Sequence, residues 1–227
     1  GTPLNERLSD IIEDVDRCET EDDAAVAFMR GYLANAGNVV GEWAFGNYLL
    51  YANLNVQQID SLLDAAPAHF KDLQRVQKLR ADAEAKQKTD VGQPYADFEV
   101  MGLDGRLQKL SDYVTPGHFA IVDFWASWCG PCRKEIATLK KIRDNLGAKI
   151  DFVGVAVWDE PDDTRRAIDE LQIPWPVIIG TEKLTAPTDL YGISGIPCIL
   201  LIGTDGTILA RGLQGDELID AVKNLVK

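Results

Sequence analysis

Two cysteines with two residues between them are the part of this sequence best suited to chemistry. They stand in the run Trp128-Cys129-Gly130-Pro131-Cys132, directly after an apolar segment that we expect to be a buried strand. A helix starting at Pro131 would hold the first sulfur at its N-terminus, where free N–H groups and the helix dipole stabilise anions. We therefore expect Cys129 to be the reactive thiolate and Cys132, one turn further, to be the resolving thiol.

A dithiol of this kind exchanges electrons with disulfides. A free thiol has a pKa of about 8.5, and comparable helix-end sites lower it to roughly 7, so the thiolate fraction at neutral pH rises from a few per cent to about half. Cys129 would attack a substrate disulfide, and Cys132 would then attack the mixed disulfide, which releases reduced substrate and leaves the protein oxidised.

A metal site and an inert pair are the alternatives for these two cysteines. A zinc half-site would need two more Cys or His ligands at suitable spacing, and the two histidines, His69 and His118, do not form a second ligand pair. We therefore expect no metal and no cofactor beyond the Cys129–Cys132 disulfide itself. An inert buried pair would share the same spacing.

The remaining cysteines do not complete a disulfide framework, since four in all are too few and too unevenly spaced. Cys18 falls in a predicted acidic helix and is interpreted as structural or incidental. Cys198 is expected to be a packed free cysteine, because isolated cysteines are usually small buried hydrophobes. An approach of Cys198 to Cys132 remains an alternative.

The composition and charge of the chain limit the kinds of partner that it could bind. The net charge of -13, with no long run of Lys or Arg, argues against binding to nucleic acid or to bare membrane. No apolar stretch approaches the roughly 20 residues needed to cross a bilayer, so we expect no transmembrane segment in this chain. A segment removed upstream of Gly1 would be compatible with an exported or lipid-anchored protein.

The chain is predicted to contain two domains, a helical one at residues 1–90 and an α/β one at residues 91–227. In the first, Asn55 and Gln58 fit a capping box, and residues 39–54 are too apolar to be exposed. Pro67 suits the first turn of a further helix. An apolar stripe would continue behind it, formed by Phe70, Leu73, Val76 and Leu79.

The second domain alternates predicted strands and helices, which favours a mixed sheet flanked by helices. A hairpin is expected around Asp205-Gly206. The predicted strands are residues 119–126, 151–157, 177–179, 198–202 and 207–210, and the predicted helices are residues 131–146, 162–171 and 216–226.

The motifs resemble those of the thioredoxin superfamily. The run from Val122 to Cys132 is similar to the thioredoxin active-site strand and turn, and Gly195-Ile196-Pro197 is similar to that family's cis-proline loop. Residues 91–98 and 132–135 resemble, more narrowly, the extracytoplasmic TlpA/ResA-like branch, including its Bacteroidetes-type members with a preceding helical segment. The resemblance covers roughly residues 91–227 and implies a thioredoxin-like fold.

The resemblance also implies roles for individual residues. Pro197 would be cis and lie against the dithiol, and Ile196 would offer backbone groups to a substrate strand. Trp128, Gly130 and Pro131 would complete the substrate-binding surface. An ordinary trans proline is the alternative.

Two carboxylates match positions in related families, and we expect them to take part in proton transfer. Asp123 matches the buried aspartate of thioredoxin, and Glu135 matches the active-site glutamate of the ResA-like branch. We expect Asp123 to dominate proton handling and Glu135 to tune it. A strand-end Asp satisfied by backbone N–H groups and a solvated helix Glu are the alternatives.

The function favoured by these features is thiol:disulfide oxidoreduction, with reduction of disulfides in exported proteins preferred over oxidation and cytochrome c maturation a role found in the family. Partners would be disulfide-containing proteins and a membrane or soluble thiol electron donor, in a periplasmic setting. A peroxidase is one alternative, but Val122 and Ala126 stand where the proline and threonine of the peroxidatic Pro-x-x-x-Thr-x-x-Cys signature would precede Cys129. A partner-binding module that docks through the helical region is another.

Overall fold

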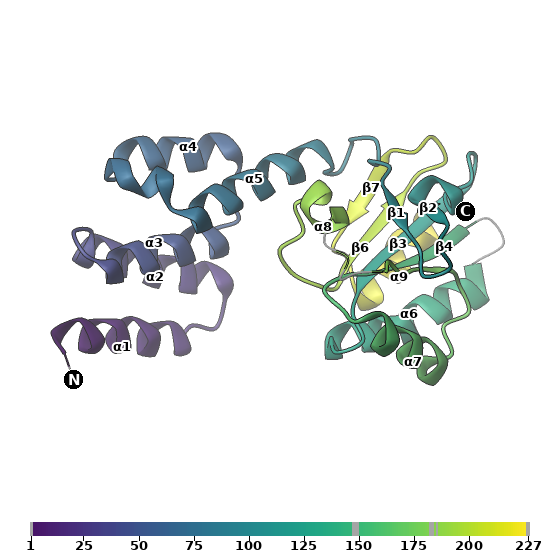
Figure 1. Cartoon of the computed structure of the whole chain (residues 1–227), viewed down its shortest axis with the longest axis horizontal. Coiled ribbons are helices and arrows are strands. Elements are labelled where there is room, and N and C mark those ends of the chain that lie inside the picture. Colours follow the sequence, from purple (N-terminus) through teal and green to yellow (C-terminus); the bar gives the residue numbers. More distant parts are fainter. Residues whose placement is uncertain (1, 147–149, 182–183, 185, 226–227) are drawn as a thin grey trace. The chain divides into compact units, whose positions relative to one another are not determined.

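The computed structural model describes residues 2–146, 150–181, 184 and 186–225. The chain divides into two compact units, Gly1–Glu84 and Ala85–Lys227. Figure 1 shows helices in the first unit and a sheet covered by helices in the second. The boundary predicted near residue 90 falls shortly after this division, which lies within α5 (Gln74–Lys88).

Helices make up the first unit, as predicted. The Asn55–Gln58 capping box is confirmed at the start of one of them, because each side chain accepts from the other residue's backbone N–H. The apolar segment predicted as core forms a helix whose Phe45 and Leu49 are buried with Ile59 and Phe70. The helices before α5 are α1 (Pro3–Asp16), α2 (Glu21–Asn35), α3 (Val39–Tyr51) and α4 (Val56–Ala65).

Two details of this unit were predicted wrongly. Pro67 does not open an α-helix: a short 3₁₀ helix, η1 (Ala68–Asp72), follows it, and the chain is extended at Leu73 before α5 begins. A three-residue apolar spacing suits a 3₁₀ helix as well as an α-helix, and the burial of Phe70 against Phe45, with ring centroids 5.1 Å apart, fixes this turn. Cys18 lies just beyond the end of α1 rather than inside a helix.

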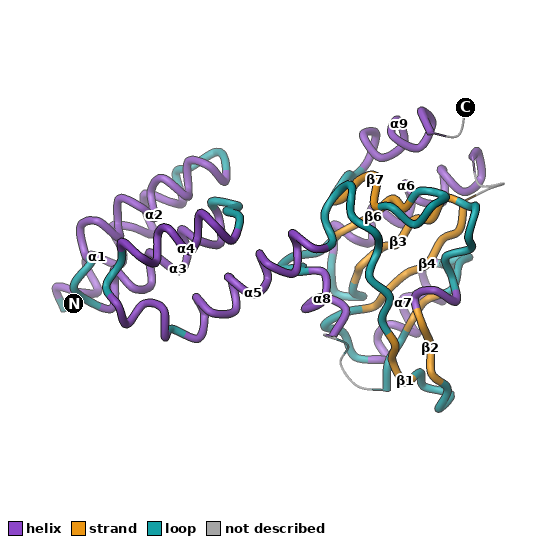
Figure 2. The backbone as a smooth tube through the Cα atoms, turned by 90° about the horizontal axis from the view of Figure 1, so that it is seen from above, coloured by secondary structure: helices purple, strands orange, loops and turns teal. Residues whose placement is uncertain are grey.

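The second unit is built on a five-stranded mixed sheet of order β5-β4-β3-β6-β7, in which β3, β4 and β5 are parallel and β6 and β7 are antiparallel to their neighbours. Figure 2 shows these strands as the centre of the unit. The strands are β3 (Phe119–Trp125), β4 (Ile150–Ala156), β5 (Val177–Ile178), β6 (Cys198–Ile202) and β7 (Ile208–Arg211), and the principal helices are α6 (Gly130–Leu146), α7 (Pro161–Leu171) and α9 (Gly215–Leu225).

The predicted mixed sheet flanked by helices is therefore confirmed. Asp205 accepts from the backbone and hydroxyl of Thr207, and Gly206 takes a φ of 86° that a glycine tolerates, so the predicted hairpin turn is also confirmed. Three short elements were not predicted, because three strand residues or six helical residues carry little periodicity. They are β1 (Glu99–Met101), β2 (Leu107–Lys109) and α8 (Ala186–Tyr191), and a 3₁₀ turn, η2 (Leu110–Asp112), follows β2.

Both faces of the central sheet are buried, which explains why β3 is apolar along nearly its whole length. Residues that alternate along a strand point to opposite faces. Ile121 and Trp125 of β3 pack with Ile136 of α6 and Leu218 of α9 on one face. Val122 and Phe124 pack on the other face, in a cluster that includes Tyr191 of α8.

Candidate redox site

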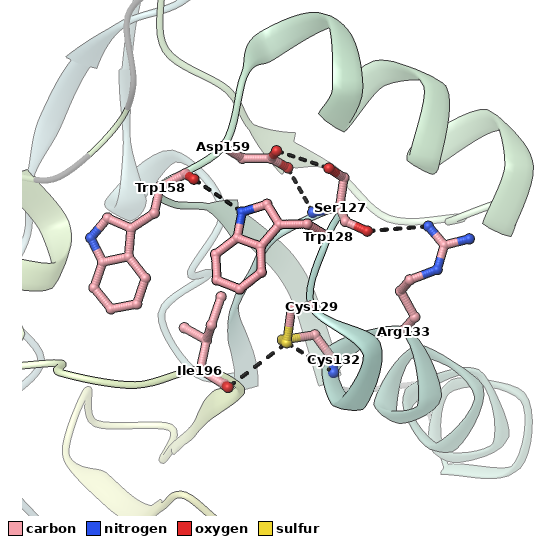
Figure 3. The surroundings of a disulfide bond; sticks show 8 residues. All are labelled: Ser127, Trp128, Cys129, Cys132, Arg133, Trp158, Asp159 and Ile196. Carbon is pink, nitrogen blue, oxygen red and sulfur yellow. Dashed lines mark hydrogen bonds between the residues drawn. A yellow bond between two sulfur atoms is a disulfide. The ribbon is translucent and has the colours of Figure 1, made fainter.

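The two cysteines of the predicted dithiol lie at the junction between β3 and α6. They form a disulfide with Cα atoms 5.3 Å apart, and both are buried, at 3% exposure for Cys129 and 0% for Cys132. The backbone N–H of Cys132 points at Cys129 Sγ over 3.2 Å (Figure 3). This N–H is one of the free donors of the first turn of α6, so it stabilises negative charge on Cys129 when the disulfide is reduced.

The loop before β6 approaches the disulfide from the other side. The peptide bond between Ile196 and Pro197 is cis, and the Ile196 carbonyl oxygen lies 3.8 Å from Cys129 Sγ. Trp128 is 61% exposed beside it and donates its indole N–H to the Trp158 carbonyl over 3.1 Å. An exposed aromatic ring and a backbone carbonyl thus flank the sulfur that we expect to react.

The remaining predicted substrate-binding residues belong to the turn itself. Gly130 and Pro131 are the first two residues of α6. A proline suits this position because its missing N–H would have no partner inside the helix.

Asp123 lies in the middle of β3 at 1% exposure, and no described hydrogen-bond partner reaches its Oδ1. Burial first, and the negative charge of Glu135 second, raise its pKa to about 7. The alternation along β3 places its side chain on the same face as Trp125 and the disulfide. The structure thus shows a buried carboxyl group that titrates near neutral pH on the dithiol face of the sheet, not a strand-end Asp held by backbone donors.

Glu135 is tied to a helix end rather than solvated. Its Oε2 accepts from the Gly215 N–H over 3.0 Å, at the start of α9. A carboxylate at a helix N-terminus is favourably placed. Glu135 therefore joins α6 to α9 while its charge acts on Asp123, and the first of these two contributions was not predicted.

Cys198 does not approach the disulfide. It opens β6 opposite Phe124, and its side chain belongs to the cluster on the sheet face away from Cys129 and Cys132. It is a free cysteine at 8% exposure, and burial raises the pKa of its thiol. The expected packed free cysteine agrees with this position, whereas contact with Cys132 does not.

Asp159, which follows β4, was not predicted to belong to the site. Its carboxylate accepts from both the backbone N–H and the hydroxyl of Ser127, two residues before Cys129 (Figure 3). One signal in the sequence could have found it. The carboxyl ends of parallel strands meet at one edge of a sheet, so a polar residue just after the strand predicted at residues 151–157 belongs near the end of β3.

Two further features concern the part of the chain that the structure describes, namely clustered metal ligands and helices that could span a membrane. It holds no group of three or more His, Cys, Asp or Glu side chains placed to bind a metal ion. Among its helices, none combines the length and the apolar composition that crossing a bilayer requires.

The fold agrees with what the chain resembles among known proteins. The model of the AhpC/TSA family matches residues 91–211. The thioredoxin domain of a thiol-disulfide oxidoreductase from Bacteroides vulgatus superposes with a TM-score of 0.52 at 28% identity, over 61% of this chain and 99% of that one. The thioredoxin-like fold predicted for the second domain is thereby confirmed.

Curated relatives carry names of the same enzyme class. The thiol:disulfide interchange protein CycY of Rhizobium leguminosarum bv. viciae is 32% identical over 120 residues, which are 53% of this chain and 63% of the relative. The thiol-disulfide oxidoreductase ResA of Bacillus thuringiensis subsp. konkukian is 22% identical over 143 residues, 63% of this chain and 80% of the relative. The chain thus spans less than two thirds of the length of the first of these relatives. Both names match the predicted class.

Proposed function

Because this chain belongs to the AhpC/TSA family, we propose that it is a thiol:disulfide oxidoreductase that reduces disulfides of exported proteins through Cys129 and Cys132. One observation carries the proposal. The Cys132 N–H at the start of α6 points at Cys129 Sγ, and that same sulfur lies 3.8 Å from the Ile196 carbonyl, directly after the exposed Trp128. The same sulfur atom thus has a donor that would stabilise its thiolate and a neighbouring backbone that could pair with a substrate strand.

The proposed reaction moves two electrons from the dithiol to the substrate. The Cys129 thiolate attacks one sulfur of a substrate disulfide, which forms a mixed disulfide and releases the other substrate sulfur as a thiolate. The Cys132 thiolate then attacks Cys129 Sγ. The Cys129–Cys132 disulfide forms, the second substrate thiolate leaves, and both substrate thiolates take up protons.

Asp123 is proposed to accept the proton that Cys132 loses before its attack. A general base works best when its pKa lies near the working pH, and the pKa of Asp123 is raised to about 7. A carboxyl group with one oxygen lacking a described hydrogen-bond partner can take up a proton without first breaking a bond. Burial, and second to it the charge of Glu135, keep the pKa of Asp123 high.

The remaining parts of the proposal concern the setting. The substrates would be disulfide-containing proteins outside the cytoplasm, with cytochrome c maturation as one such setting, and a membrane or soluble thiol donor would return the dithiol to its reduced form. The proposed reaction needs no cofactor other than the two cysteines. The names of the relatives, a thiol:disulfide interchange protein and a thiol-disulfide oxidoreductase, support this class of chemistry.

The test is reduction of insulin by dithiothreitol, followed by turbidity, with the Cys129→Ser and Cys132→Ser variants beside the wild type. We expect the wild type to accelerate the reaction and both variants to fall to the uncatalysed rate. Cys132→Ser should also accumulate a mixed disulfide through Cys129, because its resolving thiol is gone. A wild type no faster than Cys129→Ser would favour a binding module.

Two further measurements distinguish a disulfide reductant from a disulfide oxidant and from a peroxidase. The reduction potential of the Cys129–Cys132 pair, from alkylation in glutathione buffers and mass spectrometry, should lie near the value of about −270 mV typical of a reductant rather than about −120 mV of a strong oxidant. Consumption of hydrogen peroxide with a thiol donor should stay at the level of Cys129→Ser. Fast consumption by the wild type would instead indicate a peroxidase.

A further inference from the structure

We infer that Asp159 is a positioning residue for the proposed reaction: through Ser127 it fixes the turn that holds the Cys129 thiolate against the N-terminus of α6. This inference rests on the proposed function, but its main measurement does not require turnover.

Asp159 is a buried carboxylate that links neighbouring segments through hydrogen bonds, not a solvated surface acid. The residue is only 7% exposed and comes directly after Trp158, just beyond the end of β4. One oxygen accepts from the Ser127 N–H at 2.6 Å and the other from the Ser127 hydroxyl at 2.8 Å. Thr164 Oγ1 and the Glu160 N–H donate to the same carboxylate at 2.8 and 3.0 Å. Four donors on one carboxylate fix its position in two directions, toward the dithiol turn and toward α7.

Ser127 is held from a second side as well. Its carbonyl oxygen accepts from Arg133 of α6 over 3.3 Å, and the other arm of that guanidinium pairs with Glu170 of α7 over 2.6 Å. All three polar groups of Ser127, its N–H, hydroxyl and carbonyl, are therefore in use. The residue cannot rotate without breaking a charge-assisted hydrogen bond.

The next residue toward the cysteine is fixed by the same loop. Trp158, adjacent to Asp159, takes a φ of 53°, which is uncommon for a bulky side chain. In this conformation its carbonyl accepts the indole N–H of Trp128, the residue before Cys129 (Figure 3). Strained backbone of this kind persists where surrounding contacts enforce it, and it gathers at functional sites. The loop after β4 thus holds both residues that lead into Cys129.

Positioning and charge make opposite predictions for Cys129. If Asp159 positions the turn, its removal loosens the alignment between Cys129 Sγ and the Cys132 N–H, and the pKa of Cys129 rises. If Asp159 acts through its negative charge, its removal lowers the pKa of Cys129, because a nearby anion disfavours the thiolate. The variants leave in place the other charged groups that line the hollow beside Ser127, which are Arg133, Asp163, Arg166 and Glu170.

The experiment compares Asp159→Ala with Thr164→Val in the reduced protein of residues 1–227. The rate of iodoacetamide alkylation of Cys129 is followed against pH by mass spectrometry of the labelled peptide. For Asp159→Ala we expect the pKa of Cys129 to rise, and a rise from roughly 7 to roughly 8 slows alkylation at pH 7 about fivefold. Insulin reduction should slow in parallel.

Thr164→Val is the matched control. It removes a donor from the same carboxylate at a position of 1% exposure and keeps both Ser127 bonds, so the pKa of Cys129 should stay at the wild-type value. Ser127→Ala, which loses the hydroxyl bond and keeps the N–H bond, should shift the pKa in the same direction as Asp159→Ala by a smaller amount, and it decides the question if Asp159→Ala does not fold.

An unchanged or lowered pKa of Cys129 in Asp159→Ala, or an equal rise in Thr164→Val, would overturn the inference. Failure of the proposed function looks different. In that case the wild type does not accelerate insulin reduction, yet the alkylation profiles of the variants can still be measured.

Discussion

Replacement of Asp123 by Asn should change how the stability of the oxidised protein depends on pH. The pKa of Asp123 is raised from 3.8 to about 7 because the side chain is fully buried and lies near the charge of Glu135. In the unfolded chain the same carboxyl group returns to its ordinary value. The folded state therefore binds more protons than the unfolded state between these two pKa values, and stability must fall as the pH rises across this interval.

The size of the effect follows from the two pKa values. A tenfold change in a protonation equilibrium corresponds to about 1.4 kcal/mol, so moving the pKa from 3.8 to about 7 costs the folded state about 4 kcal/mol at pH 8. Well below pH 3.8 both states are protonated and the cost vanishes. The asparagine side chain of the variant is neutral at every pH, so the variant should gain about 4 kcal/mol relative to the wild type between pH 4 and pH 8.

The assay is urea unfolding of both oxidised proteins at a series of pH values, followed by tryptophan fluorescence. Four of the five tryptophans, Trp125, Trp128, Trp158 and Trp175, lie in the second unit and report on its unfolding. The disulfide keeps Cys129 and Cys132 from titrating. Subtracting one pH profile from the other cancels the contributions of groups that both proteins share. One such group is Asp151: burial opposes its ionisation, but hydrogen bonds from Thr115 and His118 lower its pKa on balance.

Glu135→Gln provides the matched control. Its amide oxygen can still accept from the Gly215 N–H, so the charge is removed while the link between α6 and α9 is kept. The pKa of Asp123 should fall, and the loss of stability should end at a lower pH than in the wild type. Parallel profiles for the wild type and Asp123→Asn would refute the reasoning, since Asp123 would then titrate alike in the folded and unfolded states.

Two further predictions concern the opposite face of the sheet. Cys198→Ala should leave insulin reduction and the Cys129–Cys132 pairing unchanged, because the sheet separates this thiol from the disulfide; a tenfold loss of activity, or a disulfide that includes Cys198 in the wild type, would contradict this. Tyr191→Phe should lower the free energy of unfolding by about 1–3 kcal/mol, because the Tyr191 hydroxyl donates to the Ala96 carbonyl and accepts from its N–H. The Tyr113 hydroxyl has no hydrogen bond to the described residues, so the control variant Tyr113→Phe should lower the free energy of unfolding by less than about 0.5 kcal/mol. Urea unfolding measures both variants.

Prediction from the sequence succeeded where the determinants are local. The strand, turn and helix around the dithiol are consecutive in the sequence, so the residues on either side of Cys129 were enough to predict them. The capping box at Asn55 and the turn at Gly206 each depend on residues two or three positions apart. Contacts between distant residues were not readable in this way. Ser127 and Asp159 are 32 positions apart, and Glu135 and Gly215 are 80 positions apart. The end of the strand predicted at residues 151–157 could have placed Asp159 near the end of β3, but no pattern in the sequence pairs it with Ser127 or pairs Glu135 with Gly215.

The position of Cys198 depends on the register between β6 and β3, which the sequence alone does not reveal. A packed free cysteine was expected there, but its place directly after Pro197 left open a sulfur beside the dithiol. The pairing of β6 with β3 excludes that alternative, because Ile199 lies opposite Asp123 and Cys198 opposite Phe124. Residues directly opposite each other share a face, and a shift of one residue would move every side chain of β6 to the other face. Such a shift would put Cys198 on the face of Asp123 and Cys132, where a third thiol could compete for the disulfide. The observed register places Ile199 there instead, and this is why we propose a mechanism with two cysteines.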